Sequence, residues 1–396
     1  MNYEISQNEL QQRQQAVLAE VGQRGGAALV LFGSTEIFYL SKFAFIPTER
    51  PMSLVIKSDG SSLLFVPRLE HEHAEENAFV GRVVSYPEYP SDVHPMQRFV
   101  QLLTELGLAN STLVVDSDGY SSSWGYHGPR LSEALPQAKI VPGRDIIENL
   151  RMIKTPEEIA LIRESCRWGN SAHVLLQEYS LLGRTESEIS MRASMEATMT
   201  MMKTMGKNYR PVSFGGTGAS AGFRGQIGPN SAYPHAININ ATLQVGDNLV
   251  TGAGARVFGY GSELERTMFV GEPSAEQRRF FDLMVELQDI CFAAIKPGHS
   301  CSEVDVEMRR FYEEHDLWPY WRHHVGHALG LLGHEAPFLD IGDQTIIQPG
   351  MVFSVEPGIF VMGLGGFRHS DTLVVTETGI ELLTYYPRDL ASLICG

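Results

Sequence analysis

Cysteine, basic residues and long apolar runs are all scarce in this 396-residue chain. The four cysteines, Cys166, Cys291, Cys301 and Cys395, form no Cys-x-x-Cys pair and no zinc spacing. This scarcity argues against a disulfide-stabilised secreted protein and fits a reducing compartment. The longest apolar run, at 27–32, is far shorter than the ~20 residues that a transmembrane helix needs. We therefore expect no membrane-spanning segment.

The low content of basic residues also limits the partners that the chain can have. Its 31 Lys and Arg face 47 Asp and Glu, which gives a formal net charge of −16. Nucleic acids and anionic membranes both bind basic surfaces, so the acidic balance argues against either partner. The first ten residues contain no basic segment followed by an apolar one, so we expect no signal peptide. These observations predict a soluble cytoplasmic protein.

Residues 1–150 alternate helix and strand signals. Ser6 and Glu9 form a capping box that begins a helix, and the apolar runs at 27–32 and 52–56 predict buried strands. Further helix and strand patterns follow up to residue 150. We predict a small α/β domain with a mixed sheet over residues 1–150.

The pattern changes near Arg151. Thr155 followed by Pro156 and Glu158 combines an N-cap, a proline in the first turn and a capping glutamate. Similar caps predict helices over 186–204 and 275–296. Strands are predicted at 212–214, 248–251, 267–270, 352–355, 372–376 and 380–383. Helices separated by antiparallel strands predict an α+β domain over residues 151–396.

Four histidines fall within twelve residues: His323, His324, His327 and His334. Glycines surround them and allow close approach of the backbone, which favours a site over a helix face. The alternative is a chance cluster of solvated histidines. The separate roles of His323 and His324, and that of His369 further along the chain, stay open.

The segment 259–270 contains Glu263 and Glu265, which lie two residues apart. In a strand these two carboxylates share one face, while Leu264 and Arg266 point the other way. Two carboxylates on a half-buried face repel each other and need a metal ion, a cation or an acid–base task. The alternative is an exposed edge strand, where such a pair is harmless.

Two further residues are candidates for chemistry. Glu356 precedes Pro357, which forces the glutamate into an extended backbone. His235, in the segment 233–236, is a candidate acid–base group, although a lone histidine is more often a packed or solvated one.

Taken together, these motifs resemble the creatinase, aminopeptidase P and prolidase family, whose catalytic half has the pita-bread fold. The resemblance covers nearly the whole chain. It includes a creatinase-type N-terminal domain and the segment 151–159, which is similar to the family's entry into the second domain. It implies a pita-bread domain over residues 151–396.

The metallopeptidases of this family hold two metal ions with two aspartates, a histidine and two glutamates. By resemblance, His327 and Glu356 fall on the histidine and the first glutamate. Gly252 and Glu263 take the positions of the two aspartates, and Ser370 replaces the last glutamate. Because a pair of divalent ions needs several carboxylate oxygens, we expect no dinuclear site.

The departures from the metallopeptidase pattern resemble creatinase, the metal-independent branch of the family. Creatinase also has a glutamate in the sequence Leu-Glu-Arg-Thr, which is Leu264–Thr267 here. By the same resemblance, His235 corresponds to the acid–base histidine of creatinase. Arg50 resembles the arginine that reaches across the creatinase dimer to the substrate carboxylate.

We therefore predict a creatinase-like, metal-independent hydrolase that cleaves an amidino or amide C–N bond in a small polar compound. The expected enzyme has no cofactor, binds no metal ion and forms a homodimer. The expected catalytic residues are His235, Glu265, Glu356 and His327. The expected substrate-binding residues are Arg50, Glu263, His334 and Arg224.

Two alternatives remain open. Glu263, His327 and Glu356 are also a plausible set of ligands for one metal ion, which would make the chain an Xaa-Pro dipeptidase or aminopeptidase. The second alternative, which we weigh below the first, is a catalytically silent relative that binds a ligand or partner, because a fold does not guarantee an activity.

Overall fold

The computed structural model describes residues 3–212 and 218–396. It divides into two compact units, one formed by Ile5–Arg151 and the other mainly by 152–211 and 218–396. Of the strand predicted at 212–214, only Val212 lies within the described residues.

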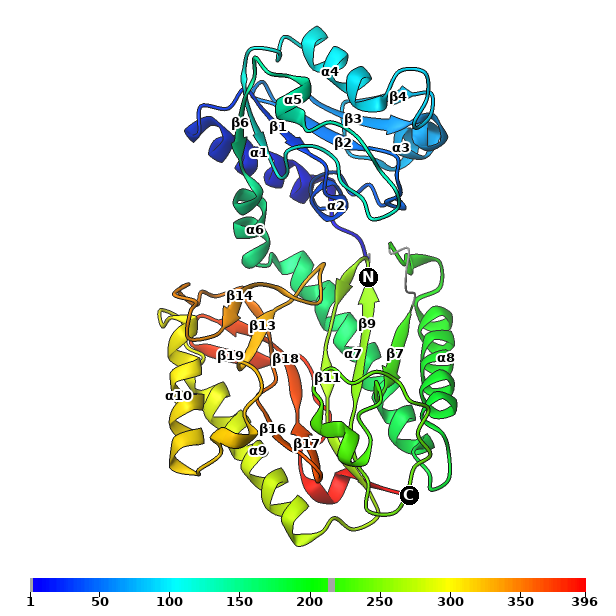
Figure 1. Cartoon of the computed structure of the whole chain (residues 1–396), viewed down its shortest axis with the longest axis vertical. Helices are drawn as coiled ribbons and strands as arrows, with labels where there is room; N and C mark the ends of the chain where they lie inside the picture. The colour runs from blue at the N-terminus through cyan, green and yellow to red at the C-terminus, as the bar shows by residue number, and fades with distance from the viewer. Residues whose placement is uncertain (1–2, 213–217) are drawn as a thin grey trace. The chain divides into compact units, whose positions relative to one another are not determined.

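A six-stranded mixed sheet forms the centre of the first unit (Figure 1). Its strand order is β4-β3-β2-β1-β5-β6, and β1 pairs antiparallel with β2 but parallel with β5. The predicted mixed sheet is therefore present. The elements of this unit are α1 Gln7–Gln23, β1 Ala28–Leu31, α2 Ser34–Ser41, β2 Ser53–Lys57, β3 Ser62–Pro67, α3 His71–Asn77, β4 Arg82–Tyr86, α4 Pro95–Glu105, β5 Thr112–Val115, α5 Leu131–Ala134, β6 Lys139–Pro142 and α6 Arg144–Met152.

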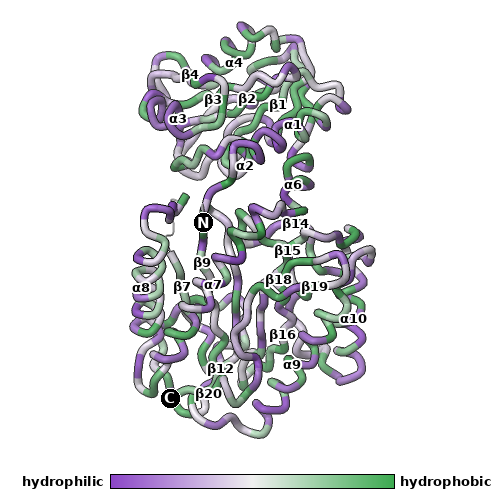
Figure 2. The backbone as a smooth tube through the Cα atoms, turned by 180° about the vertical axis from the view of Figure 1, so that it is seen from behind, coloured by the Kyte–Doolittle hydropathy of each residue, from purple (hydrophilic) through white to green (hydrophobic). Residues whose placement is uncertain are grey.

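The hydrophobic core of this unit lies between the sheet and the helices that cover it. Val30, Phe65 and Phe99 are fully or almost fully buried in one core. Helix α3 is largely polar along its length and appears purple in Figure 2. Helix α1 begins where the capping box predicts, because the Ser6 hydroxyl accepts a hydrogen bond from the Glu9 N–H.

The second unit contains a larger, mainly antiparallel sheet flanked by two pairs of helices (Figure 1). Helices α7 and α8 pack against β7 and β9, while α9 and α10 pack against β15 and β14. Its elements are α7 Pro156–Tyr179, α8 Glu186–Met205, β7 Ala219–Gly222, β8 Asn248–Val250, β9 Gly252–Val257, β10 Tyr260–Gly261, β11 Leu264–Glu265, β12 Thr267–Val270, α9 Ala275–Ala294, α10 Cys301–Glu314, β13 Gly326–Ala328, β14 Glu335–Leu339, β15 Val352–Val355, β16 Gly358–Val361, β17 Gly365–Arg368, β18 Ser370–Thr376, β19 Gly379–Leu382 and β20 Ile394–Cys395.

The order of strands in this sheet brings distant segments together. Its main path is β10-β9-β11-β18-β15-β13-β14, so β11 lies between β9 and β18. Glu265 pairs with Ser370, Val355 pairs with Gly326, and His327 pairs with Ser354. Consequently, segments around residues 263, 327 and 356 meet at one part of the sheet.

Strand β11 is held from its other face by Arg266, whose side chain is completely buried. The guanidinium forms an ion pair with Asp371 at 2.8 Å. It also donates hydrogen bonds to the carbonyl oxygens of Glu265, Ser370, Tyr386 and Pro387. A buried charge is tolerated only when it is paired and hydrogen-bonded, and Arg266 meets that condition.

The predicted α+β class and two-domain architecture are confirmed. Helices α7 and α9 begin at their predicted caps, Thr155 and Ser274. Helix α10 is absent from the sequence prediction, although Ser300 and Glu303 form a capping box at its start. Across 3–212 and 218–396, no helix is both long and apolar enough to cross a membrane.

Candidate active site

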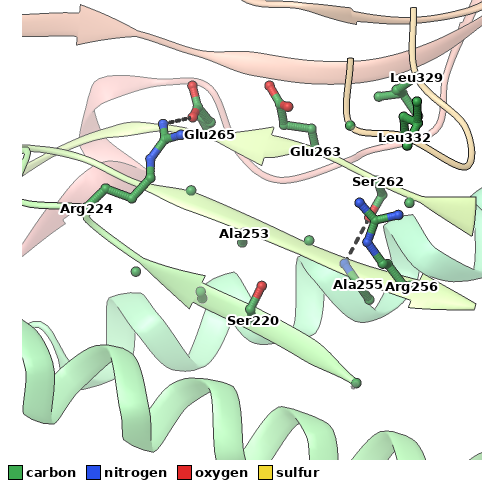
Figure 3. Close-up of a pocket in the computed structure, with 17 residues that line it drawn as sticks. Ser220, Arg224, Ala253, Ala255, Arg256, Ser262, Glu263, Glu265, Leu329 and Leu332 are labelled. Carbon is green, nitrogen blue, oxygen red and sulfur yellow. Dashed lines mark hydrogen bonds and ion pairs between the residues drawn. The ribbon is translucent and has the colours of Figure 1, made fainter. Parts of the chain in front are cut away.

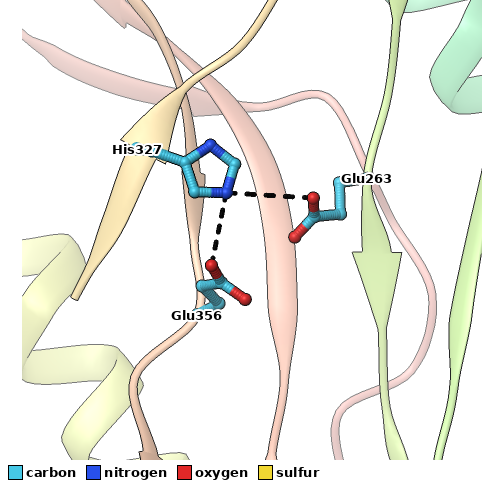
Figure 4. Close-up of side chains that lie close together, drawn as sticks. All are labelled: Glu263, His327 and Glu356. Carbon is cyan, nitrogen blue, oxygen red and sulfur yellow. Dashed lines mark ion pairs between the residues drawn. The ribbon is translucent and has the colours of Figure 1, made fainter. Parts of the chain in front are cut away.

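Three side chains from separate segments converge at the centre of the second unit (Figure 4). Glu263, His327 and Glu356 each offer one ligand atom, and these atoms all lie within 4.8 Å of one another. The Nε2 atom of His327 is 3.3 Å from Glu356 Oε1 and 4.0 Å from Glu263 Oε2. Two carboxylates and an imidazole are a common donor set for a divalent cation.

The surroundings of His327 favour metal ligation through Nε2. The side chain is fully buried, and its Nδ1 lies 3.1 Å from the carbonyl oxygen of Ala328. An Nδ1–H that donates to a carbonyl leaves Nε2 as the ligand atom, which is the usual arrangement for a metal-binding histidine. Among the described residues, Nε2 has no hydrogen bond of acceptable geometry.

In the absence of a cation, a proton is held at this position. Burial lowers the pKa of His327, but the close contact with the Glu356 carboxylate and the negative charge of Glu263 outweigh it and raise the pKa to about 9. Burial raises the pKa of Glu356, yet His327 and Arg368 outweigh that effect and hold it well below its usual range. Glu356 is therefore ionised and available as a ligand.

Glu263 is oriented by two serine hydroxyls. Ser354 and Ser370 donate hydrogen bonds to its Oε1 at 2.8 and 2.9 Å. Its Oε2 is the oxygen that faces His327. Ser370, which stands where the metallopeptidases of the family have a glutamate, thus positions a ligand but supplies no carboxylate.

Glu265 also lies in the site, but its carboxylate is already paired with two arginine side chains. Arg368 Nε lies 2.5 Å from its Oε2, and Arg224 Nη2 lies 2.6 Å from its Oε1. Burial raises the pKa of Glu265, and the two guanidiniums oppose that shift. Because β11 is flanked on both sides and Glu265 is 3 % exposed, the alternative of an exposed edge strand is excluded.

Two cavities of about 510 and 550 Å³ adjoin these residues and share Arg224, Glu263 and Glu265. Figure 3 shows the first, in which the two glutamates lie on the same side of their strand, as predicted. Several of its lining residues, including Gly222, Gly252 and Gly254, have no side chain to fill the cavity. A dipeptide-sized ligand fits cavities of this volume.

The second cavity collects most of the predicted site histidines. His235, His323, His324 and His334 line it together with Glu356. The His334 ring stacks on that of His327, with ring centroids 3.7 Å apart. Burial lowers the pKa of His323 to about 4, so this residue is neutral near pH 7.

Two residues lie elsewhere. His369 is fully buried against Phe281, and neither cavity, as defined by the described residues, is lined by it. Arg50 belongs to the first unit, where it forms ion pairs with Glu49 and Glu88. The predicted role of Arg50 in substrate binding stays a prediction.

The residues present fit one divalent cation and do not fit two. Glu263, His327 and Glu356 supply the donor set, and Nε2 of His327 lies 3.3 Å from Glu356 and 4.0 Å from Glu263. At the position of a second ion, Gly252 has no side chain, and Glu265 is already neutralised by two guanidiniums. The positive charge of those groups would repel a second cation.

Residues 160–377 match the family model described as metallopeptidase family M24, and residues 13–153 match the creatinase/prolidase N-terminal domain. The chain belongs to metallopeptidase family M24. The Xaa-Pro dipeptidase of Pyrococcus furiosus is 30 % identical over 336 residues, which cover 85 % of this chain and 88 % of that protein. The predicted family is therefore confirmed.

Two solved structures are similar to this chain over nearly its whole length. A dipeptidase, PepE, from Mycobacterium ulcerans superposes with a TM-score of 0.82 at 27 % identity, covering 98 % of both chains. An Xaa-Pro dipeptidase from Bacillus anthracis gives a TM-score of 0.79 at 25 % identity, covering 96 % of this chain and 99 % of that one.

The prediction of a metal-independent, creatinase-like hydrolase is wrong. The family is one of metallopeptidases, the relatives named above are dipeptidases, and three metal-ligand atoms converge in the structure. Gly252 and Ser370, from which the absence of a metal ion was predicted, supply no carboxylate. The three candidate ligands that remain, Glu263, His327 and Glu356, nevertheless lie close together. The chain is a hydrolase of the peptidase type, as its family indicates.

Proposed function

We propose that this M24 chain is a one-metal Xaa-Pro dipeptidase. The observation that carries the proposal is the convergence of Glu263, His327 and Glu356 within 4.8 Å. Its support on the substrate side comes from relatives that are named Xaa-Pro dipeptidases and span nearly the same length.

A divalent cation held by these residues would supply Lewis-acid chemistry, which polarises a carbonyl group and acidifies a water molecule. The chain's own residues prepare the site for it. Ser354 and Ser370 fix Glu263, and the Ala328 carbonyl fixes the tautomer of His327. This preorganisation keeps the ligands in position before substrate binds.

The leaving group of an Xaa-Pro bond is a secondary amine, which must receive a proton. His235 is exposed and lines the second cavity together with Glu356. It is the proposed proton donor. An imidazole exchanges protons near neutral pH and so suits this task. His334, stacked on His327, is a proposed substrate contact.

Three broader features belong to the same proposal. We place the domain division between residues 150 and 151. We also propose a homodimer in which Arg50 contacts substrate bound by the partner. Such dimers are usually two-fold symmetric, so each chain would supply its Arg50 to the other. The cytoplasmic location stays a prediction from the cysteine content.

The test measures hydrolysis of glycyl-proline by the full-length protein after metal removal and during titration with Mn²⁺, Zn²⁺ or Co²⁺. We expect activity to be lost on chelation and to reach a plateau at about one equivalent of metal per chain. Glu356→Gln should abolish both tight binding and activity. Glu381→Gln, at an exposed residue paired with Arg163, is the matched control and should leave both unchanged. Full activity in metal-stripped protein would contradict the proposal.

A further inference from the structure

Arg224 stands at the boundary of the two cavities and lines both. Its side chain is 52 % exposed, whereas that of Arg368, the other cation on Glu265, is only 3 % exposed. Both hydrogen bonds of Arg224 leave from Nη2, one to Glu265 and one to Gln226. Among the described residues, Nε and Nη1 have no partner, so they can donate to a ligand in the cavity.

The charges around Arg224 leave one positive charge in excess. Glu265 contacts two guanidiniums at hydrogen-bond distance but carries only one negative charge. The carboxylates of Glu263 and Glu356 would be neutralised by a divalent cation on the proposed metal site. Because the side chain of Arg368 is 3 % exposed and that of Arg224 is 52 % exposed, Arg224 is the more accessible of the two guanidiniums that contact Glu265. A cation that faces a cavity without a full counter-charge attracts an anionic ligand.

The backbone near Arg224 makes room for this guanidinium. A Cβ atom added to Gly252 would lie 3.9 Å from Arg224 Nε and 3.7 Å from Glu265 Oε1. A larger side chain at 252 would therefore enter the space that the guanidinium uses. Arg224 itself has a φ of 54°, a left-handed conformation that is uncommon for a residue with a side chain and carries an energetic cost. Glycine would relieve that cost, but it would provide no cation.

We propose that Arg224 binds a carboxylate group of the substrate through Nε and Nη1. This inference rests on the proposed function of the site and adds a residue and a ligand chemistry to it. A guanidinium binds a carboxylate in a two-pronged, directional way, which orients the substrate as well as holding it.

The carboxylate could be the C-terminus of a dipeptide or an acidic side chain. Calorimetry on the full-length protein loaded with Mn²⁺ separates these sources with three probes: L-proline, L-prolinamide and succinate. Proline and prolinamide share the ring and the amine and differ only in the carboxylate. Succinate carries carboxylates but no proline ring.

We expect wild-type protein to bind proline at least about tenfold more tightly than prolinamide, as is usual for a charge-assisted contact. Arg224→Gln should remove this difference by weakening proline alone. Arg224→Lys, which keeps the charge but loses the two-pronged geometry, should give an intermediate value. The matched control is Arg256→Gln, because Arg256 lines the same cavity but donates to the carbonyl oxygens of Gly259 and Leu331.

The proposal is overturned if Arg224→Gln keeps the wild-type ratio, or if wild-type protein binds neither proline nor succinate. If succinate binds, proline does not, and Arg224→Gln abolishes succinate binding, the carboxylate site is supported while the Xaa-Pro substrate is contradicted. Near-ultraviolet circular dichroism checks that each variant is folded. If Arg224→Gln does not fold, the test uses Arg224→Lys. A ratio of proline to prolinamide affinity that equals the wild-type ratio in Arg224→Lys would refute two-pronged binding by the Arg224 guanidinium.

Discussion

Metal binding at Glu263, His327 and Glu356 should depend steeply on pH between about 6.5 and 8.5. The pKa of His327 in the metal-free protein is about 9, because its interactions with Glu356 and Glu263 outweigh the effect of burial. Below that pH a proton occupies Nε2, and a metal ion must displace it. The apparent affinity should therefore rise about tenfold for each pH unit in this range.

The number of protons released when the metal ion binds is a second, independent test of this reasoning. A group two pH units below its pKa is ~99 % protonated, so binding at pH 7 should release about one proton from His327 and at pH 9 about half of one. The neighbouring His334 has its pKa lowered, first by burial and then by the charge of His327, so it stays neutral and contributes little. Titration of Mn²⁺ in two buffers of different ionisation enthalpy measures this number.

The matched control is His327→Gln, which keeps a polar side chain but cannot hold the proton. Its affinity should be much lower and almost independent of pH, and any protons that it releases come from other groups and are subtracted. An affinity for the wild-type protein that stays flat from pH 6.5 to 8.5 would refute the reasoning. It would mean that Nε2 either is unprotonated in the free protein or does not bind the metal ion.

Two further substitutions test other parts of the site. His235→Gln should lower kcat for glycyl-proline by about 100-fold or more through loss of proton transfer, with an unchanged melting temperature because the residue is exposed; a loss below about threefold contradicts the role. Gly252→Asp combined with Ser370→Glu should leave the metal content at one ion per chain, because the new aspartate would pair with Arg224, whose Nε lies 3.9 Å from the Cβ position. Adding Arg224→Ala to these two substitutions should raise the metal content, measured by elemental analysis, to two ions per chain. Two ions in the double mutant that keeps Arg224 would show that the guanidinium does not block a second ion.

Local sequence signals predicted much of the fold. The caps at Ser6, Thr155 and Ser274 fixed where three helices begin, because capping is decided by residues within one turn. The alternation around Glu263 and Glu265 correctly predicted a shared face, although β11 itself spans only two residues. These features depend on neighbours in the chain and can be derived from it.

The chemistry of the site could not be predicted in the same way. Whether Glu265 is a free carboxylate depends on Arg224 and Arg368, which lie 41 and 103 residues away. Likewise, the capacity of Glu263 and His327 for a metal ion depends on the distance between strands, which periodicity does not report. Counting ligands against a family pattern treated each position alone and so led to the wrong prediction about metal dependence.

The acceptors that allow Arg266 to be buried lead us to expect that this site is completed late in the synthesis of the chain. The carbonyl and carboxylate oxygens that receive its guanidinium lie 104 to 121 residues later in the chain. A nascent chain that has emerged as far as residue 360 already contains Glu263, His327 and Glu356, yet the guanidinium of Arg266 still lacks its acceptors at Ser370, Asp371, Tyr386 and Pro387. The guanidinium must stay hydrated until those acceptors are present, so β11 cannot yet take its final position in the sheet. Ligand geometry is therefore completed by a segment that contributes no ligand of its own.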